Sequence, residues 1–113
     1  MAFDEDLAGR IRELLSTEDG LSEKRMFGGL GFMINGHMAV AASSRGGLMV
    51  RVAPQRGSEL SSVGPAVQME MQGRPMKGWL HLEASAVPTD RELARWVGYG
   101  VDHAKSLAEK KLD

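Results

Sequence analysis

The sequence predicts an α+β fold in which helices cover one face of an antiparallel sheet. Three observations lead to this prediction. Apolar residues alternate with period two in the middle of the chain, segments near both ends have helical periodicity, and short glycine-containing turns separate the strands. A chain of 113 residues without a repeat, linker or low-complexity segment is expected to fold as one domain over residues 1–113.

The first helix is predicted to begin at the acidic residues 4–6 and to end before Gly20. Negative charge is favourable at a helix N-terminus because the aligned peptide dipoles place partial positive charge there. Apolar residues recur at helical spacing and form one stripe that can pack on a core. These residues are Leu7, Ile11, Leu14 and Leu15.

Three strands are predicted to follow, at residues 30–34, 37–42 and 48–52. Asn35-Gly36 joins the first two as a hairpin turn, because both residues tolerate the positive φ that such a turn requires. Residues 24–27 are open to two interpretations. They either extend the first strand across a bend at Gly28-Gly29 or form a short strand of their own.

The second half begins with a short helix predicted over residues 54–62 and stopped by Gly64-Pro65. Residues 67–71 alternate as a half-buried strand. Residues 73–78 are predicted to turn the chain, so that residues 79–83 pair back onto that strand.

The last helix is predicted to start at a capping box, in which the Thr89 hydroxyl caps the helix and Glu92 reaches back to the cap amide. It is expected to run to about Lys110. Gly98 and Gly100 lie inside it, although each costs about 1 kcal/mol relative to alanine. We expect them to permit close approach to the sheet or to a second subunit. The predicted order is α-β-β-β-α-β-β-α in two layers.

The sheet face without helices should be polar in a monomer, but here it is predicted to carry methionine, glycine and alanine. Met33 and Met49 fall on this face and are interpreted either as interface residues or as part of an irregular core. Met26 and Met38 are assigned to the core. Eight methionines and a semi-apolar face favour an adaptable interface. The hypothesis is a homodimer or a protein partner bound across this face.

No catalytic, cofactor or metal site is predicted. The chain has no cysteine, and no two of its three histidines lie at metal-ligand spacing. The glycine-rich residues 28–31 are followed by a strand, whereas a phosphate-binding loop opens into a helix. We therefore expect a chain that is not an enzyme and needs no cofactor.

The sequence also predicts a cytoplasmic protein without membrane contact. Its N-terminus is acidic where a signal peptide would be basic. No segment approaches the ~20 apolar residues that a membrane span needs.

Charge is unevenly distributed, although the net value is only −1. Residues 1–20 carry a net −4, residues 21–60 carry a net +3, and the remaining residues sum to zero. Direct nucleic-acid binding is therefore an alternative function, although nucleic-acid-binding proteins usually concentrate more positive charge on one face. The residues involved would be Lys24, Arg25, Arg45, Arg51 and Arg56.

A second alternative is a small-molecule enzyme or sensor at the stretch from Arg74 to Trp79. Arg74 and Lys77 are predicted to share one hairpin loop, with Met76 between them, Trp79 at its base and His81 nearby. Two cations beside an aromatic ring can hold an acidic side chain or a phosphate. The competing interpretation is a solvated turn.

Four stretches are more specific together than any one of them alone. They are Lys24–Phe32 followed by Asn35-Gly36, Gly47–Val52, Gly73–Trp79, and Trp96-Val97. In this combination, from about residue 8 to residue 108, the chain resembles the TfoX/Sxy N-terminal domain family. The resemblance implies an α+β sandwich of the type III secretion chaperone-like kind.

The resemblance also implies a role in regulating natural competence for DNA uptake. The best-known members act as coactivators beside the cyclic-AMP receptor protein and carry a second, C-terminal helical domain, whereas this chain stops after the last helix of the first domain. The family supplies no catalytic residues. The leading prediction is thus a non-enzymatic, homodimeric protein-interaction module that acts on transcription through a protein partner. The candidate partner-binding residues are Lys24, Arg25, Phe27, Met33, Met49, Arg74, Met76, Lys77 and Trp79.

Overall fold

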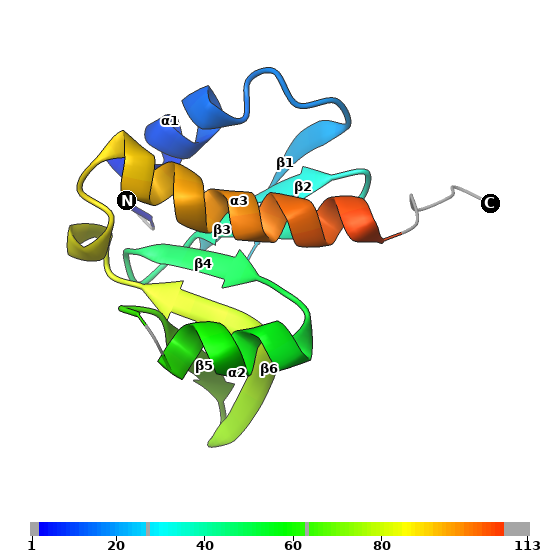
Figure 1. The fold of residues 1–113 in the computed structure, drawn as a ribbon. Coiled ribbons are helices and arrows are strands. Elements are labelled where there is room, and N and C mark those ends of the chain that lie inside the picture. Colours follow the sequence, from blue (N-terminus) through cyan, green and yellow to red (C-terminus); the bar gives the residue numbers. More distant parts are fainter. Residues whose placement is uncertain (1–2, 27, 63, 108–113) are drawn as a thin grey trace.

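The computed structural model describes residues 3–26, 28–62 and 64–107. Within these ranges the chain forms three α-helices, one 3-10 helix and six strands (Figure 1). This α+β architecture confirms the predicted fold class. The elements are α1 (Glu5–Leu14), β1 (Leu21–Met26), β2 (Gly29–Ile34), β3 (His37–Ala42), β4 (Leu48–Arg51), α2 (Pro54–Ser62), β5 (Val67–Met71), β6 (Arg74–Leu82), η1 (Ala84–Ala86) and α3 (Asp90–Ser106).

The six strands form one sheet in the order β1-β2-β3-β4-β6-β5, and every neighbouring pair is antiparallel. Helix α3 crosses β3 and β4, and α2 lies against β6 (Figure 1). Helix α1 packs against both α3 and β3. The helices thus share one face of the sheet, and β1 and β5 form its two edges.

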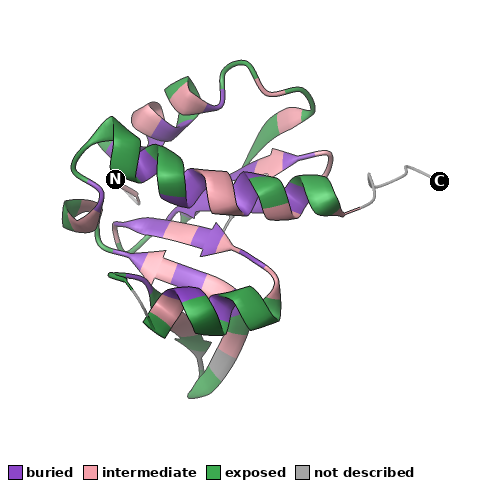
Figure 2. Cartoon of the chain, viewed as in Figure 1, coloured by how far each residue is buried: buried purple, intermediate pink, exposed green. Residues whose placement is uncertain are grey.

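The core lies between the helices and this face of the sheet (Figure 2). Phe32, Val50 and Leu80 from the sheet are fully buried there, together with Ile11 of α1 and Leu93 of α3. Burial of side chains of this size stabilises the fold by about 1.5 to 3 kcal/mol each, before the conformational entropy cost is subtracted. Alternate residues of the strands face the core, which is why period-two alternation predicted them.

The observed order of elements contains one strand, β1, that the predicted order lacks. Residues 21–26 form a strand that pairs with β2 from Leu21 opposite Ile34 to Met26 opposite Gly29. The chain reverses at Gly28, whose φ is +80°. A positive φ of this kind permits a tight turn instead of a gentle bend. Of the two interpretations of this segment, the separate strand is therefore correct.

Strand β6 begins earlier than predicted. Gln72 and Gly73 have φ values of +53° and +79°, which makes them the two central residues of a tight hairpin turn. Arg74 already pairs with Met71 across this turn. The prediction that residues 73–78 form a loop was wrong, because glutamine supplied a positive φ that the sequence did not reveal.

Helix α3 starts where the capping box predicted. The Glu92 amide donates a hydrogen bond to the Thr89 hydroxyl oxygen at 3.2 Å. The carboxylate of Glu92 accepts from that same hydroxyl at 3.0 Å and does not bind the cap amide as predicted. The helix is observed to Ser106, and its predicted end near Lys110 lies outside the described residues.

A bulge in β3 changes the predicted facing of one methionine. Phe32 pairs with Val40 and Met33 pairs with Met38, so Ala39 is an extra residue in β3. Val40 belongs to the core cluster, whereas Met38 lies on the opposite face of the sheet. Met38 is buried, as its assignment to the core predicted, but the bulge interrupts the alternation and places it on the open face, outside the core cluster.

Gly100 provides the close approach expected of the glycines in α3. A Cβ atom at this position would collide with the Ala39 carbonyl oxygen and would lie 2.9 Å from a methyl group of Val40. Helix α3 therefore rests directly on the bulge of β3. Gly98 has no neighbour within 4 Å of such an atom, so it makes no close approach to the sheet.

We predict opposite effects of alanine at these two glycines. Gly100→Ala should destabilise the chain by about 1 to 3 kcal/mol, because the added methyl group overpacks the contact with Ala39. Gly98→Ala should stabilise it by up to about 1 kcal/mol, since alanine restricts the unfolded helix segment without meeting a neighbour. Urea unfolding of both variants beside the wild type measures the two changes, and equal effects would contradict the role assigned to Gly100.

Candidate functional site

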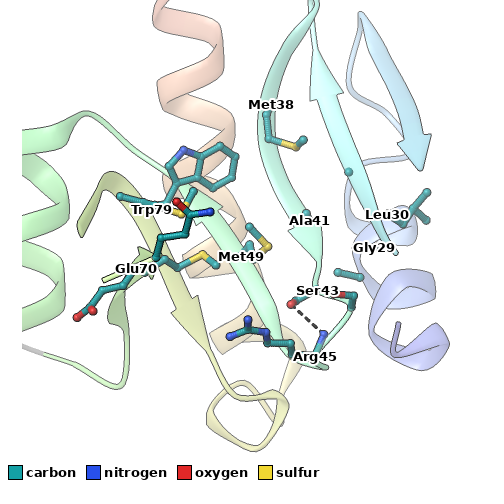
Figure 3. A pocket seen from close by; sticks show the side chains of 15 residues that line it. Gly29, Leu30, Met38, Ala41, Ser43, Arg45, Met49, Glu70 and Trp79 are labelled. Carbon is teal, nitrogen blue, oxygen red and sulfur yellow. Dashed lines mark hydrogen bonds between the residues drawn. The ribbon is translucent and has the colours of Figure 1, made fainter. Parts of the chain in front are cut away.

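The face of the sheet opposite the helices is concave and holds a pocket of about 500 Å³ (Figure 3). We call it the methionine pocket, because Met38, Met49, Met69 and Met76 line it together with Trp79. These side chains come from β3, β4, β5 and β6, and the backbone of β2 closes one side. Pockets of 300–1,000 Å³ with mainly apolar walls are typical of binding sites.

Small residues in the middle of the sheet produce the hollow. Gly31, Ala41, Met49 and His81 are consecutive cross-strand neighbours on β2, β3, β4 and β6, so they form one row across this face. A glycine followed by an alanine leaves little side-chain volume at the centre of the row. Larger side chains flank this point, and the molecular surface therefore forms a depression there.

Gly31 also makes room for Met38. A Cβ atom at residue 31 would lie 2.6 Å from the Met38 methyl carbon and 2.9 Å from its sulfur. The thioether of Met38 thus occupies the space above the glycine. Gly29, at the start of the same strand, runs so close to β3 that a Cβ atom there would lie 2.6 Å from the Ala42 carbonyl oxygen. The chain has two glycine-rich stretches, Lys24–Phe32 and Gly73–Trp79, and these contacts explain two of the three glycines in the first.

Gly78 shapes the opposite wall of the pocket. It has a φ of +86°, and its carbonyl accepts a hydrogen bond from the Val52 amide at 2.8 Å. The β5–β6 register shifts in this region, since Gln68 pairs with Leu80 but Glu70 pairs with Pro75. This irregularity allows Met76 and Trp79, three residues apart in one strand, to line the same pocket.

The two glycine-rich stretches therefore meet in space. The first contributes residues 29–31 of β2 and the second contributes Met76 and Trp79 of β6. Two strands, β3 and β4, separate them in the sheet, and the curvature of the sheet brings both to one pocket.

Positive charge prevails around the methionine pocket. Arg45 lies at its rim and Glu70 is the one acidic residue that lines it within the described ranges (Figure 3). The guanidinium of Arg51 lies 5.6 Å from the centre of the Trp79 ring, within the range of a cation–π interaction. Lys24 is paired with Gly31 and is exposed at the end of the same row. An occupant with negative charge next to an apolar group would complement this arrangement.

A family model described as the TfoX N-terminal domain matches residues 13–104. The chain belongs to this family. The match confirms the resemblance seen in the sequence, and the family suggests a competence-related regulatory domain. No curated protein and no solved structure matches the chain. Among the described residues of this TfoX N-terminal domain, no helix combines the length and apolar character needed to span a membrane.

Three of the predicted partner-binding residues, Met49, Met76 and Trp79, line the methionine pocket of the domain. Lys24 and Met33 lie beside it on the same face, paired with Gly31 and Met38. The open face thus brings five of the nine candidates together.

The remaining candidates are placed elsewhere. Arg25 lies over the ring of Phe3 at 5.7 Å and is directed away from the pocket. Arg74 and Lys77 are exposed along β6 and do not share a hairpin loop. Phe27 lies outside the described residues.

Sequence reasoning missed the contribution of Met38, Met69 and Glu70 to the pocket. Met69 alternates with polar neighbours, so its half-buried position could be predicted from the sequence. Its proximity to Met38 could not, because that depends on the order of the strands and the curvature of the sheet. The bulge at Ala39 has no sequence signal of its own. Glycine and alanine were predicted on the open face, yet nothing in the sequence showed that Gly31 and Ala41 lie side by side.

The five basic residues proposed for nucleic-acid binding do not share one surface. Lys24, Arg45 and Arg51 lie around the open face. Arg56 lies over the ring of Tyr99 of α3 at 5.4 Å, on the helical side, and Arg25 also faces that side. This distribution gives no single basic stripe of the kind that duplex DNA selects.

The histidines of the domain have structural surroundings. A ring nitrogen of His81 lies 3.0 Å from the Gly46 carbonyl oxygen. Partial burial lowers the pKa of His103, and the positive charges of Arg51 and His37 lower it further. Across the residues that the structure describes, no three His, Cys, Asp or Glu side chains gather in a way that could hold a metal ion.

We predict that His103 makes the domain less stable in mild acid. Its lowered pKa means that the unfolded chain binds the proton more readily, so the free energy of unfolding should fall as the pH drops through about 6.5. In His103→Gln this fall should be smaller, and in Arg51→Gln it should be reduced in part. Urea unfolding between about pH 7.5 and 5.5 measures the slopes, and a wild-type slope equal to that of His103→Gln would contradict the prediction.

Proposed function

We propose that this TfoX N-terminal domain is a non-catalytic interaction module that acts on transcription through a protein partner. The partner binds the methionine pocket with an apolar segment that carries acidic residues beside it. The observation that carries this proposal is the meeting of both glycine-rich stretches at one pocket with thioether and indole walls.

The chemistry of the walls supports a protein segment as the occupant. Methionine side chains are unbranched and polarizable, so Met38, Met49, Met69 and Met76 can adjust to the shape of an inserted side chain. Trp79 adds a large, rigid contact surface of the type that often dominates binding energy. An acyl- or phosphoryl-transfer enzyme would need a nucleophile, a base and an oriented donor around a reacting atom. The lining offers Ser43, Ser44 and Glu70 without a histidine.

Charge complementarity supports the acidic character of that segment. Arg45 lines the pocket, Arg51 lies over the ring of the pocket residue Trp79, and Lys24 lies at the end of the row of small residues. Within the described part of the chain, none of these three cations forms an ion pair in the free domain. Acidic side chains of a partner can therefore pair with them without displacing an internal partner.

The regulatory role rests on family membership. The best-known relatives of this family act beside the cyclic-AMP receptor protein at competence promoters. An adaptable groove on a small domain is suited to contact with such a transcription factor or with RNA polymerase. We therefore propose transcription machinery as the partner class, with competence as the regulated process.

The proposal predicts site-specific capture of a transcription protein in the native host. A photoreactive p-benzoylphenylalanine in place of Met76 should cross-link one such protein, because residue 76 lines the pocket. Adding Met49→Lys should lower the yield by about tenfold or more, since a buried ammonium opposes the apolar contact. Mass spectrometry of the cross-linked product identifies the partner.

The matched control carries the photoreactive residue in place of Ser58, which is exposed on α2 at the helical face. It should not capture the same protein. Equal capture from both positions, or capture that Met49→Lys leaves unchanged, would place the partner outside the methionine pocket. A captured protein unrelated to transcription would contradict the regulatory part of the proposal.

A further inference from the structure

The two edge strands of the sheet differ in how they are protected against pairing with another chain. In β1 three successive residues are charged, and two of them are engaged by neighbouring elements. Glu23 accepts hydrogen bonds from Arg12 of α1 at 2.7 and 3.0 Å, and Arg25 lies over Phe3. Charged residues on an edge strand oppose edge-to-edge association. Strand β1 is therefore a protected edge.

Strand β5 lacks this protection. Its sequence VQMEM contains one charged residue, Glu70, and no lysine or proline. Val67 is 64% exposed, and it is the one exposed large hydrophobic side chain among the described residues. The hairpin of β5 and β6 forms the lower end of the molecule in Figure 1, and α2 packs against it from the helical side. An edge strand of this composition is a template for a further strand.

The backbone of β5 has unused hydrogen-bonding capacity on its outer side. On its inner side it pairs with β6, and no other strand of the described sheet lies beyond it. None of the hydrogen bonds between described residues outside regular elements involves residues 67–71. Alternate amides and carbonyls of β5 therefore point outward and can pair with another strand.

We propose that this strand pairs with the β5 strand of a second copy of the chain, antiparallel and related by a two-fold axis. With the axis perpendicular to the sheet, both concave faces lie on the same side. Val67 shares its face of the sheet with His81, with which it is paired. In the proposed pair, Val67 must lie opposite an odd-numbered residue of the other copy's β5 strand, because opposite residues in an antiparallel pair share a face.

The charge pattern of β5 selects one register. A two-fold axis that passes beside Glu70 would pair this residue with Glu70 of the other copy and place two like charges opposite each other, which is destabilising. An axis at Gln68 would leave the last two residues of the strand, Glu70 and Met71, opposite residues outside β5. An axis at Met69 pairs all five residues, places Val67 opposite Met71 of the other copy, and keeps the two Glu70 residues from lying opposite each other. The sequence of this strand is thus compatible with pairing to itself.

This dimer goes beyond the proposed function, because it does not depend on what occupies the methionine pocket. It does change the surroundings of that pocket. Met69 and Glu70 line it, so the β5 strand of the second copy lies at its rim. Two pockets then open on the same side of one twelve-stranded sheet, and a partner with two binding segments gains effective concentration from engaging both.

Multi-angle light scattering tests the association over about 1 to 500 µM, a range suited to a small interface. The wild type should be dimeric at the upper end of this range. Val67→Lys with Met69→Lys should be monomeric throughout, because lysine at these positions charges the edge. The matched control is Ser22→Lys on the edge strand β1, which should remain dimeric. Circular dichroism establishes that each variant is folded. A monomeric wild type, or a dimer that survives the β5 lysines, would overturn the proposal.

The absence of cysteine from the sequence permits a second test that leaves the fold almost unchanged. Residues directly opposite in an antiparallel pair have Cα atoms about 4.5–5.5 Å apart, within the range that a disulfide spans. Oxidised Met69→Cys should therefore form a covalent dimer in high yield, whereas Ser22→Cys should not. Equal yields from the two variants would overturn the register, and with it the β5 interface.

Discussion

The contact between Gly100 of α3 and the bulged residue Ala39 of β3 is the constraint on which the site depends. Any side chain at residue 100 would push the helix away from the Ala39 carbonyl oxygen. The extra residue in β3 reverses the alternation, so that Val40 faces the core while Met38 moves to the open face. A contact on the helical side of the sheet therefore determines a wall of the pocket on the other side.

The glycines of the open face act together with this bulge. Gly31 leaves the space that Met38 fills, and Gly78 bends β6 so that Met76 and Trp79 face the same hollow. Neither stretch forms a site alone, because each supplies only one wall. Both stretches are thus required to build one pocket.

The sequence was sufficient for most of the fold and for part of the site. The helices α1 and α2, the Asn35-Gly36 turn and the start of α3 followed from periodicity and capping, which are local properties. The bulge at Ala39 and the positive φ of Gln72 have no signal in the residue types, so the face of Met38 and the strand position of Arg74 were not predicted. The pocket could not be predicted, because it depends on strand order and curvature, which bring Met69 and Gly31 together across the sheet. Met49 and Trp79 were found because unusual residues on a strand face are visible without that knowledge.

The two faces of the sheet differ in the kind of packing they offer, and this difference bears on function. On the helical face, Phe32, Val50 and Leu80 are fully buried and fixed by branched or aromatic neighbours. On the open face, the walls are flexible thioethers around a floor of glycine and alanine. A rigid core holds the strands in place, while the open face can adapt to the occupant at little conformational cost. Adaptable walls discriminate weakly by shape, so in the proposed complex selectivity comes from Arg45 at the rim, from Arg51 over the Trp79 ring, and from the orientation that these cations impose on an acidic partner.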